Sequence, residues 1–159
     1  MLLTRTMDVA TDTIEKAIAL RYNARALIRF GSVEEGREKY REALEVISNS
    51  MLLDPDKVYF NSETLLYEAE DEFFVGQCNS GAQLVDEAAR KARSVSRPPD
   101  VQYAQYVNGR IAALQNLLDR CNHTRSTGVV FPKVEPPIPT PMPQPDLTKA
   151  FKLSPSGRY

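Results

Sequence analysis

Histidine, cysteine and long apolar runs are scarce in this 159-residue chain, and tryptophan is absent. The single histidine, His123, and the two cysteines, Cys78 and Cys121, form no cluster with zinc-ligand spacing and no CxxC pair. No apolar run approaches the ~18 residues that a membrane span needs. No glycine-rich phosphate loop and no serine-centred nucleophile elbow occurs. These absences predict a chain that is not an enzyme, needs no cofactor or metal, takes no small-molecule substrate and does not span a membrane.

The charge balance argues against a nucleic-acid-binding protein. The net charge is −1, whereas nucleic-acid binders usually carry a basic excess. The residues after Cys121 include five basic and two acidic side chains, a net charge of +3, which leaves −4 for the rest. This imbalance favours contact of the C-terminal segment with an acidic surface, its own or a partner's. A basic run at Arg90, Lys91, Arg93 and Arg97 could bind phosphate, but attraction to a helix C-terminus explains it more simply.

The two cysteines are interpreted as small buried side chains in a reducing compartment, with a disulfide between them as the less favoured alternative. The N-terminus has no signal-peptide core, and Asp8, Asp12 and Glu15 argue against a mitochondrial presequence because such leaders are poor in acids. We therefore expect an intracellular protein. The cytoplasm and an organelle such as a mitochondrion or plastid both stay open.

Helical spacing of apolar residues predicts five helices before residue 122, and hence an all-α fold. They cover about 12–30, 32 to the Asp54-Pro55-Asp56 break, 62–75, 79–95 and 100–121. Asp12 with Glu15, and Ser32 with Glu35, have the spacing of capping boxes. Residues 1–11 either extend the first helix or lead into it, and 58–60 form either an extra helical turn or a packed loop. Short connections predict antiparallel neighbours.

The C-terminal segment 122–159 has a different composition from the helical domain 1–121. Eight of the eleven prolines fall between Pro132 and Pro155. Proline lacks an amide donor and has a fixed dihedral, so we expect an extended arm of polyproline type. Spacers are usually poor in apolar residues, yet this arm contains several. We expect it to bind partner proteins through Phe131, Ile138, Leu147, Phe151, Leu153 and Tyr159.

Segments 31–44 and 76–89 form an internal repeat. Each begins with a helix-ending glycine, Gly31 or Gly76, and continues with a small residue, Gly36 or Gly81, that allows a close helix approach. A larger residue follows four positions on, and a second small residue three positions after that. The larger pair is Tyr40 and Val85, and the small pair is Ala43 and Ala88. This order is typical of a helical hairpin that stacks on its neighbours.

The first segment resembles the tetratricopeptide repeat, whose turn and second helix read roughly Gly-x-Tyr-x-x-Ala-x-x-x-Tyr-x-x-Ala-Leu, with the small Gly36 in place of the first Ala. Gly31, Gly36, Tyr40, Ala43 and Leu44 match, and Val33 stands where the family has tyrosine. The second segment matches only at Gly76, Gly81 and Ala88, and the repeat length is 45 where the family has 34. That difference implies an insertion around 58–61. The fifth helix would resemble the helix that closes such arrays.

The resemblance implies protein binding through the groove formed by the first helix of each pair. The groove positions of the first repeat fall near Arg21, Arg25, Ile28 and Ser32. The carboxylate clamp known in the family does not carry over, because its Lys and Asn pair is missing. We predict partner contacts at Arg21 and Arg25.

Two other polar groups have competing interpretations. Tyr103 and Tyr106 are predicted as partner contacts because tyrosine is enriched at interfaces, or else one packs inward and one stays half exposed. Four acids lie close together on one predicted helix, so their side chains should point in several directions around its axis: Glu68, Glu70, Asp71 and Glu72. We therefore expect a solvated face there and not a metal or acid–base site. His123 is expected at the surface near a helix C-terminus.

These patterns together predict a scaffold that binds other proteins. It would be an accessory or structural subunit of a larger complex, with the helical module docked and the arm threaded over neighbouring subunits. The alternative is a free-standing adaptor or co-chaperone that binds peptides in its helical groove.

Overall fold

The computed structural model describes the backbone of residues 2–98 and 100–127 and the side chains of 11–98 and 100–122. It contains five helices, and these described residues include no strand. The helices are α1 (Leu2–Arg29), α2 (Val33–Ser48), α3 (Asp54–Phe74), α4 (Cys78–Arg93) and α5 (Val101–Thr127). The all-α prediction for the helical part is confirmed. The proline-rich arm and its six predicted contact residues lie outside the described residues.

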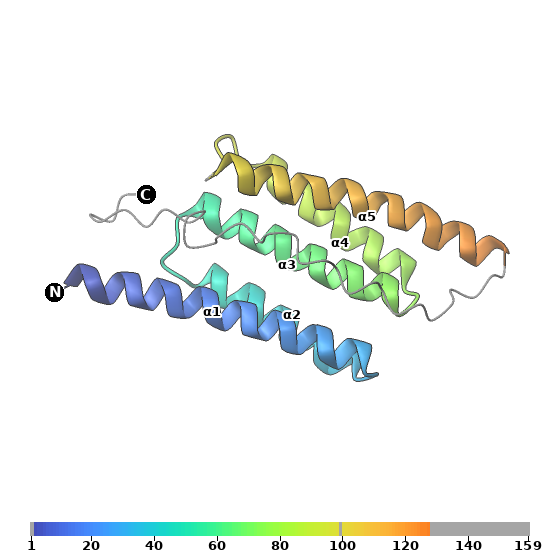
Figure 1. Cartoon of the computed structure of the whole chain (residues 1–159), viewed down its shortest axis with the longest axis horizontal. Helices are drawn as coiled ribbons and strands as arrows, with labels where there is room; N and C mark the ends of the chain where they lie inside the picture. The colour runs from blue at the N-terminus through green and yellow to red at the C-terminus, as the bar shows by residue number, and fades with distance from the viewer. Residues whose placement is uncertain (1, 99, 128–159) are drawn as a thin grey trace.

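The helices form two layers (Figure 1). Helices α1, α3 and α5 run side by side in the same direction, and α2 and α4 return behind them. The closest helix pairs are α1 with α2 and α3 with α4. The chain is therefore two antiparallel hairpins and a fifth helix, stacked so that the first helix of each unit faces the same way.

The two hairpin turns have the same backbone geometry. Gly31 has φ +101° and Gly76 has φ +82°, a left-handed conformation that favours glycine. The N–H of Ser32 donates to the carbonyl of Leu27 and the N–H of Gln77 to that of Glu72, both at 2.8 Å. This bond closes each preceding helix as a Schellman motif does. The repeat predicted from the sequence is thus a repeat of structure at both turns.

The second glycine of each segment lies where two helices touch. A Cβ at Gly36 would come within 2.4 Å of Ile28 Cγ1 and 2.8 Å of the Ala24 carbonyl oxygen. A Cβ at Gly81 would come within 2.5 Å of the Phe73 ring. Ile28 and Phe73 each stand eight residues before their glycine, so the two hairpins pack in equivalent ways. The predicted role of these glycines in close approach is confirmed.

The main core lies between α3, α4, α5 and the ends of α1 and α2, and includes Phe60, Leu66, Val85 and Val107. A second small cluster of Ala24, Ile28 and Tyr40 lies inside the α1–α2 hairpin. In α5, Ala104, Val107, Leu114 and Cys121 are buried, and Ile111, Leu117 and Leu118 are partly buried against this core. Met51 follows the end of α2 at Ser48 and is 77% exposed.

Several helix boundaries differ from the prediction. Helix α1 begins at Leu2, so Asp12 lies inside it and caps nothing. Ser32 occupies the N-cap position of α2, but its side chain makes no capping hydrogen bond. Helix α3 begins at Asp54, with Pro55 in its first turn. Proline is tolerated there because backbone N–H groups in the first turn have no partner within the helix. Residues 58–60 are therefore helical, which decides between the two alternatives. Helix α5 continues six residues past the expected boundary at Cys121.

Cys78 and Cys121 form a disulfide, which corrects the prediction of two free thiols. Their Cα atoms are 5.9 Å apart, within the normal range for such a bond. Both residues are buried, as expected, but the preference for free thiols over a disulfide was wrong. The bond links the start of α4 to the last turns of α5, and it does not fit the reducing compartment expected from the sequence.

Among the helices that the structure describes, none combines the length and apolarity needed to cross a membrane.

Candidate protein-interaction face

The layer of α1, α3 and α5 is crossed by two rows of paired charges. In the first row, Glu63 of α3 accepts from Arg21 of α1 at 2.7 Å through one oxygen and from the Tyr103 hydroxyl of α5 through the other. All three side chains are buried. Burial, and then the nearby Glu63 charge, raise the pKa of Tyr103 well above its usual value, so the phenol stays a donor.

The second row lies two helical turns further along α3. Glu70 Oε1 lies 2.9 Å from Arg25 Nη2 and 3.6 Å from Arg29 Nη2, and its Oε2 accepts from Arg110 Nη2 at 2.7 Å. All four side chains are partly exposed, between 16% and 32%. One carboxylate therefore holds three guanidinium groups from α1 and α5 at the surface.

Tyr67 lies between the two rows and is half-buried. Its ring centroid is 4.3 Å from the Arg110 guanidinium, 5.0 Å from Arg25 and 5.2 Å from Arg21, distances suited to cation–π contact. Burial raises the pKa of Tyr67 to about 12. Tyr106 of α5 extends the aromatic surface, since its hydroxyl accepts a long 3.4 Å hydrogen bond from Arg110.

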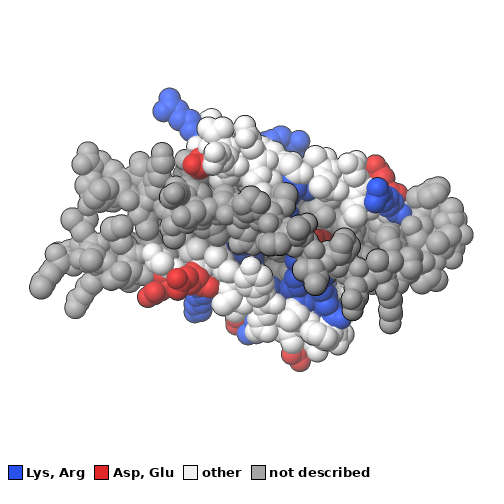
Figure 2. Space-filling model, viewed as in Figure 1, with Lys and Arg blue, Asp and Glu red and all other residues white. Residues whose placement is uncertain are grey.

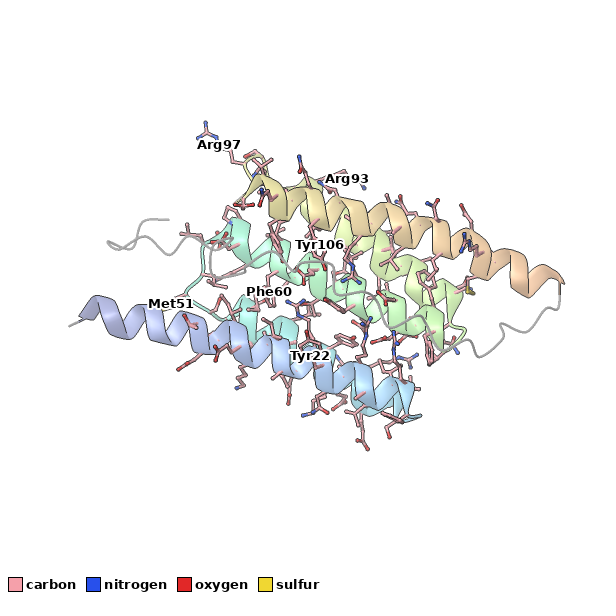
Figure 3. All side chains as sticks on the ribbon, in the orientation of Figure 1. Tyr22, Met51, Phe60, Arg93, Arg97 and Tyr106 are labelled. Carbon is pink, nitrogen blue, oxygen red and sulfur yellow. A yellow bond between two sulfur atoms is a disulfide. The ribbon has the colours of Figure 1, made fainter. Side chains whose placement is uncertain are left out.

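We call the partly exposed residues of this layer the α1/α3/α5 face. Its members are Arg25, Arg29, Tyr67, Glu70, Tyr106 and Arg110. Figure 2 shows basic atoms gathered over the C-terminal half of α1 on this side of the molecule. Figure 3 labels Tyr22 on α1, Phe60 on α3 and Tyr106 on α5; Tyr22 is exposed, Tyr106 is half-buried and Phe60 lies in the core. The face thus combines guanidinium groups with aromatic rings.

A third set of charges joins the two hairpins below the face. Asp71 is fully buried, and its Oδ1 accepts from Arg25 Nε and Arg29 Nε at 3.1 Å each. Its Oδ2 accepts from the Tyr40 hydroxyl. Glu72, 1% exposed, binds Arg37 through both oxygens at 2.6 and 2.9 Å. The prediction of a solvated acidic face is therefore wrong for Asp71 and Glu72. Arginines of α1 and α2 cover this part of α3 and pair with both acids. These pairs join residues far apart in the sequence, so the local sequence pattern did not indicate them.

The structure places the four described contact candidates in two classes. Arg21 is 5% exposed and Tyr103 is 0% exposed, and both are paired with Glu63. Arg25 and Tyr106 are half-buried on the α1/α3/α5 face. The alternative in which one tyrosine packs inward and the other stays half exposed is the observed arrangement. Partner binding by Arg25 and Tyr106 stays a prediction, while Arg21 and Tyr103 have partners inside the fold.

Four residues of the face were not predicted from the sequence as members of one site: Arg29, Tyr67, Glu70 and Arg110. A signal for them exists. Glu63, Tyr67 and Glu70 lie on one helical stripe of α3, and Tyr103, Tyr106 and Arg110 lie on one stripe of α5. Arg21, Arg25 and Arg29 recur every four residues on α1. When three helices with such polar stripes stack in one layer, the stripes can combine into one polar surface.

Other candidate sites carry less chemistry. Within the described residues, no group of three or more His, Cys, Asp or Glu could hold a metal ion. A hollow of about 410 Å³ between α1 and α2 is lined by side chains of mixed charge, including Lys16, Glu42 and Glu45. Arg93 and Arg97 project at the far edge of the molecule, near the end of α4 (Figure 3). None of these brings aromatic and charged groups together as the α1/α3/α5 face does.

Comparisons of the chain with family models, with curated proteins and with solved structures find no match. The resemblance to tetratricopeptide repeats therefore stays a prediction, supported by the two equivalent hairpin turns alone.

Proposed function

We propose that this chain is a non-catalytic scaffold that binds other proteins, as an accessory subunit of a larger assembly. The helical domain would dock on a partner through the α1/α3/α5 face. The proline-rich arm would thread over neighbouring subunits through its spaced apolar residues.

The observation that carries the proposal is the composition of the α1/α3/α5 face. Arginine and tyrosine are, with tryptophan, the side chains enriched at the energetic centres of protein interfaces. Here three partly exposed arginines and two half-buried tyrosines come from three separate helices. Buried pairs below them, such as Arg21 with Glu63, hold the layer rigid. A rigid surface loses little conformational freedom on binding, which favours affinity.

The alternative is a free-standing adaptor or co-chaperone that binds peptides in the helical groove of the same layer. Against it, Arg25, Arg29 and Arg110 each already face Glu70. A peptide carboxylate would have to displace that internal carboxylate. The layer is better suited to a partner that adds contacts around the paired charges than to one that replaces Glu70.

The test compares incorporation of tagged chains into high-mass assemblies in the native source. A chain ending at Thr127 removes the arm but keeps all of α5 and the disulfide at Cys121. We expect this chain to stay folded and to assemble poorly. Arg29→Gln with Arg110→Gln should weaken docking as well. Arg41→Gln is the matched control, because Arg41 is 65% exposed on α2 and its ion pair among the described residues is with Glu38, outside the face.

The outcomes separate the two proposals. If the chain ending at Thr127 assembles as the full chain does, the role of the arm is refuted. If the face variants abolish partner capture while the truncation has little effect, the adaptor is the correct function. If neither change alters assembly, both proposals fail.

A further inference from the structure

The α1/α3/α5 face leaves hydrogen-bond donors unused beneath its surface. The Arg21 side chain is 5% exposed, and only its Nη1 is bonded, to Glu63. Its Nε and Nη2 are buried and have no hydrogen-bond partner. The rings of Phe60 and Tyr67 cover the guanidinium plane at 4.0 and 5.2 Å, so an acceptor can reach only its edge. Buried hydrogen-bond donors are rarely left unsatisfied, so we expect an acceptor for Arg21 Nε and Nη2.

The neighbouring Arg25 has a related shortage. Its Nη2 is 2.9 Å from Glu70 Oε1, but this ion pair lacks the geometry of a hydrogen bond. In the two rows and at the buried Asp71 below them, four arginines face three carboxylates, those of Glu63, Glu70 and Asp71. The layer therefore has an excess of donors and of positive charge. A matching occupant would be rich in acceptors, poor in donors, acidic and able to stack on aromatic rings.

One segment of this chain has that chemistry. Residues 135–146 contain six prolines, the acids Glu135 and Asp146, and no basic residue. Each proline offers a carbonyl acceptor without an amide donor. Extended proline-rich segments dock into grooves lined with aromatic side chains. The basic residues of the arm, such as Lys133 and Lys149, fall outside this run.

The chain is long enough to bring this segment to the face. Tyr106 stands 21 residues before Thr127, the end of α5, which is roughly 32 Å along a helix. The 19 residues from 128 to 146 can extend to about 59 Å in polyproline geometry. After one reversal, the segment can run back along α1, α3 and α5, antiparallel to all three.

We propose that residues 135–146 dock in cis on the α1/α3/α5 face of the free chain. Their carbonyl oxygens accept from the spare donors of Arg21 and Arg25. Their prolines lie against Tyr67 and Tyr106. The proposal concerns the purified chain alone and does not depend on the scaffold function.

The absence of tryptophan provides a clean reporter. Met142→Trp in the full chain places a single tryptophan within the segment. We expect its emission to be shifted to shorter wavelength than in a peptide of residues 131–147 carrying the same substitution. We also expect acrylamide quenching to be several-fold weaker in the chain than in the peptide. Both effects should be independent of protein concentration, as intramolecular docking requires.

Two sets of changes identify the docking surface. Arg29→Gln with Arg110→Gln weakens the face, and Arg41→Gln is the exposed control on α2. Glu135→Lys with Asp146→Lys changes only the segment, outside the described helices, so it tests the proposal even if the face variant misfolds. We expect both the face and segment changes to abolish the shift and the protection from quenching. The Arg41→Gln chain should behave as the parent, with far-UV circular dichroism checking helix content.

Three results would overturn the proposal. The first is quenching in the full chain equal to that of the peptide, which means that the segment stays in solvent. The second is protection that grows with protein concentration, which means that the segment docks on a second copy. The third is protection that survives both the face and segment changes in a folded chain, which places it elsewhere. Water molecules would then be the acceptors for Arg21.

Discussion

The contacts inside each hairpin and the contacts between the two hairpins differ in chemistry. Inside the hairpins, helices meet through small and apolar side chains, with Gly36 against Ile28 and Gly81 against Phe73. Between the hairpins, buried ion pairs join them, with Asp71 and Glu72 of α3 holding arginines of α1 and α2. The first kind of contact is determined by shape, and the second by the pairing of charges.

The comparison shows that one helix can serve both kinds of contact. Helix α3 presents Phe73 to α4 and, one turn away, Glu70 and Asp71 to α1. Burying a carboxylate is costly unless it is paired and hydrogen-bonded. Asp71 meets that condition with two arginines and the Tyr40 hydroxyl. We infer that the charged contact favours one register of the hairpins, since sliding would separate the arginines from Asp71 and Glu72.

The largest effect is expected from removing a buried carboxylate between the hairpins. Asp71→Ala leaves two guanidinium groups and the Tyr40 hydroxyl without their acceptor. We expect a loss of roughly 3–5 kcal/mol in the free energy of unfolding, measured by urea denaturation. The control is Glu42→Ala, since Glu42 is 53% exposed and should contribute less than about 0.5 kcal/mol. A loss at Asp71 as small as that of the control would show that the charged contact adds no stability.

The disulfide tests a third contact, between α4 and α5. Cys78→Ala with Cys121→Ala opens a bond between residues 43 positions apart. We expect a loss of about 2–4 kcal/mol, mainly because the unfolded chain regains conformational freedom. Reduction of the parent chain by dithiothreitol should lower its stability by a similar amount and leave the variant unchanged. Equal free energies of unfolding for the oxidised and reduced chains would show that the disulfide does not stabilise the fold.

Glycine substitutions test the close contacts inside the hairpins. Gly36→Ala would force a Cβ within 2.8 Å of the Ala24 carbonyl, and we expect a loss of about 1–3 kcal/mol. Gly81→Ala should cost less, because the Phe73 ring can turn aside and a backbone carbonyl cannot.

The matched control for these substitutions is Gly109→Ala in α5. Nothing lies within 4 Å of a Cβ there. The variant should gain about 0.5–1 kcal/mol from the higher helix propensity of alanine. Thermal unfolding of the three variants gives the comparison. A stabilising Gly36→Ala would mean that the hairpins are not in close contact at this glycine.

The smallest effect is expected at a buried carboxylate that has no ion pair with a described residue. Burial raises the pKa of Asp56 from 3.8 to about 6, so the folded state binds a proton more readily than the unfolded state. The resulting stability is fully present below about pH 4 and is lost as the pH rises through about 6.

Asp56→Asn removes this dependence. Near pH 8 the free energy of unfolding of the variant should exceed that of the parent by about 1 kcal/mol. This figure allows for the loss of a favourable acid in the first turn of α3. Near pH 4 the two free energies should be equal. Urea denaturation across the pH range measures the difference. A parent chain whose stability rises from pH 4 to pH 6 relative to the variant would contradict the effect of burial.

Local patterns account for the part of the fold that could be predicted. The glycine turns and the small residues at 36, 43, 81 and 88 act within one hairpin, so short-range sterics reveal them. Helix boundaries were less certain because α1 and α3 extend through segments whose apolar spacing is weak, and no cap marks where α1 begins. Only two of the six residues of the face were predicted. Arg25 and Tyr106 were identified, while Arg29, Tyr67, Glu70 and Arg110 were not.

The sequence by itself determined the five helices, the two glycine turns and the close packing within each hairpin, because each depends on residues a few positions apart. The tertiary structure alone decided which charges are buried and which are exposed. Arg21 meets Glu63 across 42 residues, and Arg25 meets Asp71 across 46. No local pattern specifies such a pair, since an arginine on a helix has the same sequence signature whether it faces water or an acid. The stacking of α1, α3 and α5 brings these charges together and thereby creates the face.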